Sequence, residues 1–315
     1  MQLPAFIVTY STALLSAPWR FTLTYLSLIT ATSHDFLTRG LQKKYSFKTL
    51  LHFLLETKML RDGYLIIDET DVDKSFANKI ACLGWIFSHR KNKHIFGLHL
   101  VVVAWTNEKI TIPLAWKIYN KANGKTKLDL AMELIDYCLF TLRIKPKTWL
   151  FDSFYASEKL LKYLLKHKQV FYSQLPKRRL LNNHALYTFY QGRPYWQETG
   201  VIKGGVKVQV VKNRRKYYVT NAIGISRKEQ LQTYKLRWKI EEIFRFVKKE
   251  LGFEKCQSNS LQGQNTHFGV CFYLYAQLQD IAEKNQMTDY CIKQKATLDK
   301  NFVNQLALAT SLSDA

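Results

Sequence analysis

Residues 234–248 read Tyr-Lys-Leu-Arg-Trp-Lys-Ile-Glu-Glu-Ile-Phe-Arg-Phe-Val-Lys, and the rest of the chain is organised around them. This stretch contains no Gly or Pro, is rich in helix-forming residues and repeats its apolar residues at helical spacing. It therefore predicts one amphipathic helix from Tyr234 to Lys248. Gly252, shortly beyond the stretch, should end that helix.

Polar side chains on this predicted helix gather in one strip beside the apolar face. At about 100° per residue, the strip holds Tyr234, Arg237, Glu241, Arg245 and Lys248. The neighbouring Glu242 falls on the solvent side. Within the helix alone, the simplest interpretation is that Glu241 pairs with the flanking arginines, each pair contributing only about 0.2 to 0.5 kcal/mol. A carboxylate among cations and a phenol also suits a metal ion surrounded by phosphates, and the remaining sequence decides between the two.

The composition points to a large folded protein with a polyanionic partner. The chain has 315 residues, and 47% of them are apolar, which is enough for a sizeable core and excludes a disordered chain. It carries 47 Lys and Arg against 24 Asp and Glu, a formal charge of +23. That excess is far more than solubility needs, so nucleic acid is the favoured partner, ahead of an acidic membrane surface.

The cysteines and the apolar start of the chain favour a protein that works inside the cell. Five cysteines are spread along the chain without a Cys-x-x-Cys pair, which indicates reduced thiols and neither a disulfide framework nor a zinc site. Residues 3–32 are strongly apolar, with Arg20 as their only charge. Because Pro4 and Pro18 interrupt them, we expect buried helices there and not a membrane span.

Two short helices are expected before the main domain. Ser33 can cap the first, and Ser46 begins the second. The pair is compatible with a helix-turn-helix that reads DNA and equally with a helical cap on the following domain.

The middle of the chain alternates strand-like and helix-like patterns. Strands are predicted at Tyr64–Asp68, Ile95–Trp105, Lys109–Trp116, Thr148–Asp152 and Val170–Leu175, and helices at Lys127–Arg143 and Glu158–His167. This order predicts an α/β fold with a mixed sheet. The first and fourth strands both end on an aspartate, a rigid place for a metal ligand, although a single such Asp more often caps a turn.

A basic and aromatic insertion, Pro176–Thr220, separates the last of these strands from the opening helix. Its alternating patterns predict a largely β structure. Its cations and aromatic residues include Arg178, Arg179, Arg193, Tyr195, Trp196, Arg214 and Arg215. They could follow a DNA backbone and stack on displaced bases, or they could form a solvated hairpin with a small aromatic cluster.

Three carboxylates from distant parts of the chain, Asp68, Asp152 and Glu241, could converge at one end of such a sheet. Hard divalent cations prefer carboxylate oxygens, and Mg²⁺ combines few protein ligands with water and substrate phosphate. Two ions about 3.5 to 4 Å apart can activate a water or a 3′-hydroxyl for in-line phosphoryl transfer. Such a reaction needs no nucleophilic side chain.

These residues resemble a known family. Tyr234, Arg237, Glu241 and Lys248 match the Tyr-x2-Arg-x3-Glu-x6-Lys signature of DDE-class insertion-sequence transposases in residue type and spacing. The segment Leu-Ile-Ile-Asp68-Glu-Thr is similar to the first acidic motif of that family, and Trp-Leu-Phe-Asp152-Ser-Phe-Tyr to its second.

The resemblance implies an RNase H-like fold, a mixed sheet flanked by helices with a β-rich insertion before the last catalytic helix. Residues 1–60 are expected to form a helical region that is a candidate for DNA binding. The catalytic domain would span 61–285, with its insertion at about 176–222, and 286–315 would be a C-terminal tail.

The resemblance also implies a function, the cutting of transposon ends and strand transfer into target DNA. Asp68, Asp152 and Glu241 would be catalytic and hold two Mg²⁺ or Mn²⁺ ions. The resemblance implies that Tyr234, Arg237 and Lys248 hold DNA phosphates, and it makes Trp196 a candidate for holding a flipped base. Arg245 on the same strip and Arg214 and Arg215 in the insertion are expected to bind DNA as well. The partners would be double-stranded DNA, both terminal inverted repeats and target, and a second copy of the chain in the synaptic complex. The expected location is the bacterial cytoplasm, at the nucleoid.

Two alternatives stay open. A DNA-binding relic or repressor would keep the fold and the charge without turnover, although retention of all three acids and the whole signature counts against it. An RNase H-like nuclease for branched DNA would explain the acids and the charge, but not Tyr234, Arg237 and Lys248 at these spacings.

Overall fold

The computed structural model of the chain describes residues 3–47, 51, 63–77, 79–88, 91–299 and 301–303. Its helices are α1 (Ala5–Ser16), α2 (Leu23–Ile29), α3 (His34–Gln42), α5 (Lys127–Asp136), α6 (Glu158–Lys166), α7 (Arg227–Lys235), α8 (Trp238–Glu250), α9 (Leu261–Asn285) and α10 (Asp289–Leu298). Its strands are β1 (Tyr64–Asp73), β2 (Gly84–Ser88), β3 (Lys93–Thr106), β4 (Thr111–Ile118), β5 (Thr148–Leu150), β6 (Phe171–Leu175), β7 (Leu180–Leu181), β8 (His184–Ala185), β9 (Tyr195–Ile202), β10 (Val206–Asn213) and β11 (Lys216–Thr220).

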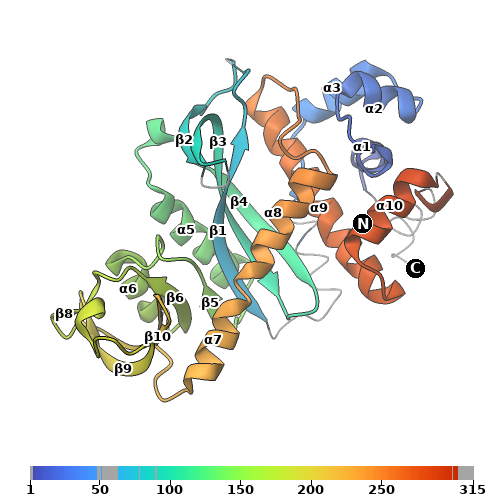
Figure 1. Ribbon diagram of the computed structural model, residues 1–315. Helices are drawn as coiled ribbons and strands as arrows, with labels where there is room; N and C mark the ends of the chain where they lie inside the picture. The colour runs from blue at the N-terminus through green and yellow to red at the C-terminus, as the bar shows by residue number, and fades with distance from the viewer. Residues whose placement is uncertain are drawn as a thin grey trace.

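All strands of the described residues join one mixed sheet. Its order is β2-β3-β1-β5-β6-β11-β10-β9-β7-β8, and β4 pairs with β3. Strands β1, β5 and β6 are parallel, and the other pairings are antiparallel. Figure 1 shows the insertion strands β8–β10 at one end of the molecule and the N-terminal helices with α9 and α10 at the other. The predicted α/β class, the mixed sheet with flanking helices and the β-rich insertion are confirmed.

Strand β1 is longer than predicted, and this decides where Asp68 lies. The sequence pattern placed the end of the strand at Asp68, but β1 continues to Asp73, because β3 pairs with it over its whole length. The parallel neighbour β5 pairs only as far as Ile66 opposite Leu150. Asp68 therefore lies mid-strand, just past the point where β1 loses its partner on one side.

The predicted helix Tyr234–Lys248 is interrupted, so that prediction was wrong in detail. Tyr234 belongs to α7, and Arg237 precedes the first residue of α8. At the junction the N–H groups of Leu236, Arg237 and Lys239 bond to carbonyls three residues back, a tighter turn than the α-helix. Because the junction keeps right-handed backbone angles, α7 and α8 follow nearly one line in Figure 1.

Helix α8 ends where the sequence predicted, whereas α5 is shorter than predicted. Gly252 has φ +63° directly after the last turn of α8, as predicted for the residue that ends it. The helix predicted at Lys127–Arg143 is regular only to Asp136, and a wider helical turn follows at Tyr137–Thr141.

The two ends of the chain form one helical layer together with α9. Helices α1 and α3 pack on α9, and α10 packs on α1, α8 and α9. The helices predicted in the apolar N-terminal stretch are present, and Ser33 caps α3 by accepting a hydrogen bond from the Phe36 N–H at 3.1 Å. The helix predicted from Ser46 falls largely outside the described residues. In the part of the chain that the structure describes, no helix combines the length and apolarity that crossing a bilayer requires.

Residues 286–315 were expected as a tail, but α10 within them is anchored in this layer. Lys293 of α10 is buried, and its ammonium donates hydrogen bonds to the carbonyls of Leu15 (2.9 Å) and Ala17 (2.7 Å), where α1 ends. It also reaches Thr297 Oγ1 at 2.9 Å. The ammonium group thus donates hydrogen bonds to carbonyls at the end of α1, where the helix itself provides no donors.

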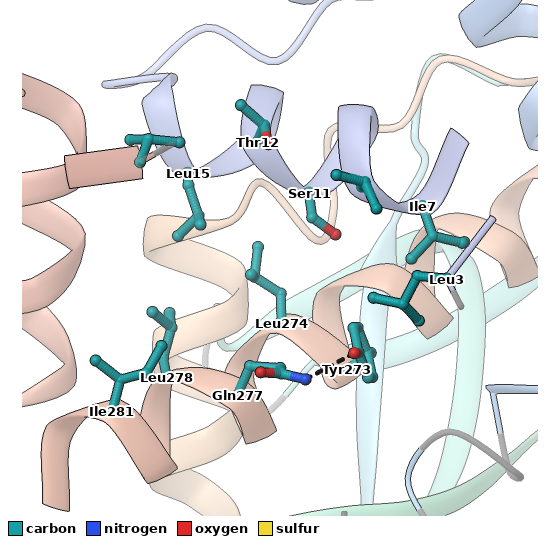
Figure 2. Close-up of a pocket in the computed structure, with 12 residues that line it drawn as sticks. Leu3, Ile7, Ser11, Thr12, Leu15, Tyr273, Leu274, Gln277, Leu278 and Ile281 are labelled. Atoms are coloured by element: carbon teal, nitrogen blue, oxygen red, sulfur yellow. Dashed lines mark hydrogen bonds between the residues drawn. The ribbon is translucent and has the colours of Figure 1, made fainter. Parts of the chain in front are cut away.

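Between α1 and α9 the layer leaves a small pocket of about 30 Å³. Figure 2 shows aliphatic side chains around it, with Ser11 from α1 and the Gln277–Tyr273 hydrogen bond (2.6 Å) from α9. The Ser11 hydroxyl has no hydrogen-bond partner. Since this volume admits only about one or two water molecules, we read the pocket as imperfect packing and not as a ligand site.

We predict that Lys293→Ala destabilises the protein by about 1 to 3 kcal/mol, because two buried carbonyls lose their donor. Burial also lowers the pKa of Lys293 from 10.5 to about 8. Between these pH values the unfolded chain binds the extra proton, so this lysine makes the free energy of unfolding rise with pH there.

Urea unfolding of wild type, Lys293→Ala and Lys293→Met at several pH values between 7 and 10 checks both points. Gln294→Ala, on the exposed side of the same helix, should change stability by less than about 0.5 kcal/mol. An equal loss in the Gln294 and Lys293 variants, or an unchanged pH slope in Lys293→Met, would contradict the anchoring role.

Candidate active site

An open cleft of about 990 Å³ lies between the exposed end of β1 and helix α8. We call it the β1–α8 cleft. Its acidic lining includes Asp68 from β1, Asp152 from the loop after β5 and Glu241 from the first turn of α8. The three acids singled out in the sequence therefore line one cavity, although each comes from a different element.

Asp68 is almost buried at the floor of the cleft. One carboxylate oxygen accepts a hydrogen bond from the Glu69 N–H at 2.9 Å, and the other accepts one from the Arg237 guanidinium. Burial raises the pKa of Asp68 to about 7; Arg237 opposes this rise, whereas the nearby charges of Glu241 and Asp152 add to it. The site thus holds a carboxyl group whose charge is costly in the absence of a further cation.

Asp152 is held by the turn that follows β5. Its Oδ1 accepts hydrogen bonds from the N–H groups of Phe154 (2.9 Å) and Tyr155 (3.4 Å), an arrangement that fixes the side chain to its own backbone. Ser157 then caps α6 by accepting from the Leu160 N–H at 3.2 Å. Burial raises the pKa of Asp152, and its two backbone hydrogen bonds oppose the rise.

Glu241 and its neighbour Glu242 occupy different surroundings. Glu241 lines the cleft and lies 3.7 Å from the guanidinium of Arg237. Glu242 does not line it and pairs with Lys239 at 3.1 Å. The two glutamates have similar side-chain exposure, 38% and 45%, so location and not burial distinguishes them.

Three of the predicted DNA-binding residues line the cleft. Arg237 lies between the carboxylates of Asp68 and Glu241. Arg245 is exposed. Lys248 donates a hydrogen bond to the Asp71 carbonyl at 2.5 Å and lies 3.3 Å from Glu254. A phosphate group in the cleft would thus meet cations that line the same cavity as the acids.

The other predicted DNA-binding residues do not line the cleft. Tyr234 is buried with its ring 5.1 Å from that of Tyr218, and burial raises the pKa of its phenol. Arg214 and Arg215 are exposed at the β10–β11 turn. Trp196 is only 7% exposed and packs against Phe189, Tyr190 and Tyr217. Its ring is therefore not accessible for stacking on a base in this conformation, because the insertion uses it as core.

Several cleft residues were missed in the sequence. Trp238 is half exposed and Phe154 is exposed, and both line the cleft. Glu69, His99 and Lys127 line it too, and they contact one another. The position of Glu69 next to Asp68 was a usable signal, whereas His99 and Lys127 are distant in sequence and carry no motif.

The charges of this second group differ from those of the three acids. Burial alone would raise the pKa of Glu69, but hydrogen bonds and charge interactions with His99 and Lys127 lower it to about 2. Burial alone would lower the pKa of His99, but hydrogen bonds to Asp71 and Glu69 raise it above its usual value. Glu69 is therefore held as an anion by His99 and Lys127.

The donor set of the cleft fits a divalent metal ion of the Mg²⁺ type. Carboxylate oxygens are the preferred ligands of such ions, and Mg²⁺ usually binds through one or two carboxylates plus substrate phosphate and water, without an all-protein cage. Among the described residues, no three His, Cys, Asp or Glu side chains are close enough together to hold a metal ion by themselves. Asp68, Asp152 and Glu241 would thus supply oxygen donors that water and phosphate complete.

Comparisons with known proteins place the chain in context. The model of a family described as the transposase DDE domain matches residues 61–276. A chain of the piggyBac transposase synaptic complex with hairpin DNA, solved by cryo-electron microscopy, has a similar fold with a TM-score of 0.60 and 11% identity. The match covers 98% of this chain and 70% of that one. No protein with a curated description matches the chain by sequence.

We predict that Arg237→Gln destabilises the protein by up to about 3 kcal/mol at pH 8, because removal of one partner from a buried ion pair leaves an uncompensated charge. The loss should be smaller at pH 6, where the Asp68 carboxyl, with a pKa of about 7, is largely protonated already. Thermal and urea unfolding measure it. Arg245→Gln, also in the cleft but exposed, is the matched control, and equal losses in the two variants would contradict the prediction.

Proposed function

The chain belongs to the transposase DDE-domain family and is a DNA transposase, and we propose that Asp68, Asp152 and Glu241 are its catalytic acids. The observation that carries this proposal is their convergence in the β1–α8 cleft from three separate elements. Transposases of this family generally use divalent metal ions. The proposed ligands here are the same three acids, with two Mg²⁺ or Mn²⁺ ions.

Such ions would supply an activated water or 3′-hydroxyl and charge neutralisation at the leaving oxygen. The chain's own residues do the rest. The backbone hydrogen bonds to Asp152 keep its other oxygen, Oδ2, free of that turn. Arg237, already paired with Asp68, would offer its remaining N–H groups to the phosphate of the scissile bond. Hydrolysis cuts the transposon end, and the freed 3′-hydroxyl attacks a target phosphate.

The proposed substrate is double-stranded DNA, first the terminal inverted repeats and then the target. The formal charge of +23 and the cations Arg245 and Lys248 in the cleft support it. The similar piggyBac chain was solved as a synaptic complex with hairpin DNA. By extension we propose a homodimer that pairs two ends, acting at the nucleoid of a bacterial cell.

The proposed division of labour follows the chain. Residues 61–285 would form the catalytic domain, and the insertion at about 176–222 would present Arg214 and Arg215 to DNA. Tyr234 would act from beneath the cleft, through Arg237, and not by direct contact. The helical region at 1–60 is a candidate for further DNA contacts.

We predict that the purified protein nicks and joins DNA carrying the ends of its own element when Mg²⁺ or Mn²⁺ is added. Loss of a residue that only supports a metal ligand typically lowers activity by about 10- to 100-fold. Because Asp152 and Glu241 are proposed as ligands themselves, Asp152→Asn and Glu241→Gln should slow cleavage by more than that. Glu242→Gln should retain most activity, because this side chain pairs with Lys239 away from the cleft. Gel electrophoresis of end-labelled DNA measures nicking and joining.

The control separates binding from chemistry. Each variant is tested for binding to the same DNA at the same salt concentration. Wild-type protein that binds the ends without nicking them would favour an inactive DNA-binding relic. Equal effects of Glu241→Gln and Glu242→Gln would refute the assignment of Glu241.

We predict further that Arg245→Ala weakens DNA binding and makes it less sensitive to salt. Loss of one phosphate contact should reduce the slope of log K against log salt concentration by about 0.9. Fluorescence anisotropy at several salt concentrations measures that slope. Lys284→Ala, which removes an exposed cation of α9 outside the cleft lining, should leave it unchanged; a similar change in both variants would mean that Arg245 acts only through net charge.

A further inference from the structure

Glu69, the residue after Asp68, is engaged through both carboxylate oxygens. Lys127 Nζ lies 2.9 Å from one oxygen and 2.8 Å from the other. His99 Nε2 lies 3.1 Å from Oε2, and the Tyr155 hydroxyl donates to the same oxygen at 3.4 Å. These partners come from α5, β3 and the loop before α6. With both oxygens occupied, Glu69 is poorly placed to bind a metal ion itself.

Two of these partners lead directly to Asp152. The N–H of Tyr155 donates to Asp152 Oδ1 at 3.4 Å, while its hydroxyl reaches Glu69. Lys127 Nζ lies 4.4 Å from the centre of the Phe154 ring, and the N–H of Phe154 donates to the same Asp152 oxygen at 2.9 Å. Glu69 is therefore connected to Asp152 in two ways, through Tyr155 and through Lys127 with Phe154.

The third partner holds Glu69 on its own strand. His99 lies opposite Asp71 in the β1–β3 register, and its Nδ1 is 2.7 Å from Asp71 Oδ1. Because side chains alternate along a strand, Glu69 and Asp71 share one face of β1, and Asp68 points to the other face. There Arg237 binds it. The strand is therefore held from both faces at two successive residues.

We propose that Glu69, held by Lys127, His99 and Tyr155, is a positioning residue that sets the separation between Asp68 and Asp152. The inference rests on the proposed metal-binding role of these two acids. Strand β3 still pairs with β1 at Asp68 and Glu69, but β1 and β5 no longer pair with each other beyond Ile66 and Leu150. Backbone pairing between these two strands therefore does not link Asp68 to Asp152, and Glu69 is where side-chain contacts between the two segments meet. Loss of a group that orients a metal ligand typically weakens metal binding by about 10- to 100-fold.

The test measures Mn²⁺ binding to the DNA-free protein by electron paramagnetic resonance, so it requires neither cleavage nor contact with phosphate. Lys127→Met should weaken Mn²⁺ binding by about tenfold, whereas Lys127→Arg, which keeps the charge, should restore most of the affinity. Tyr155→Phe removes only the hydroxyl and should weaken it by a smaller factor. Lys125→Met, which removes an exposed lysine bound to Glu133 on the same part of the chain, should leave the affinity unchanged.

A double variant shows whether Lys127 acts through Glu69. Lys127→Met combined with Glu69→Gln should bind Mn²⁺ no more weakly than Glu69→Gln alone, because the shared interaction is already lost. Full additivity, or wild-type affinity in Lys127→Met with only a lower melting temperature, would overturn the positioning role. Wild-type protein that binds Mn²⁺ no better than Asp68→Asn would instead contradict the proposed metal site itself, and this inference with it.

Discussion

The ion pair between Arg237 and Asp68 joins the two elements on which the β1–α8 cleft depends. Asp68 belongs to strand β1, between β3 and β5 in the sheet, and Arg237 lies at the start of α8; both side chains are largely buried. A carboxylate in such a place is costly to ionise, since burial alone raises its pKa. Arg237 offsets part of that cost and at the same time orients α8, so that Glu241, one turn further on, faces the same cavity.

In the cleft without substrate, acidic and cationic side chains form ion pairs with one another. Arg237 lies between two carboxylates, and Lys248 rests against the end of β1 and Glu254. A divalent ion would relieve the repulsion among the acids, and a DNA phosphate would compete for the cations. Without a ligand, burial and the neighbouring acids keep the pKa of Asp68 raised, as expected where function and not stability selects the charges.

The surrounding fold explains how this arrangement stays in place. Helix α8 packs on β1 and β4 as well as on α9, and α9 also carries the N-terminal and C-terminal helices. Lys293 ties α10 to the end of α1, so the last elements of the described chain brace the first. On the opposite face of β1, Glu69 contacts His99, Lys127 and Tyr155 and so connects β1 to the loop that carries Asp152. In both places a charged group with several hydrogen-bond or ion-pair partners connects segments that do not pair with each other through their backbones.

Sequence alone determined the α/β class, the β-rich insertion, the end of the helix at Gly252 and the three acids that line the cleft, because each depends on local pattern or on a motif. Tertiary structure decided the rest. How far β1 extends past Asp68 depends on the length of β3, whether Trp196 is buried depends on the rings around it, and the partners of Glu69 lie up to 86 residues away. Such features arise from contacts between distant segments, whose register and side-chain directions no local pattern encodes.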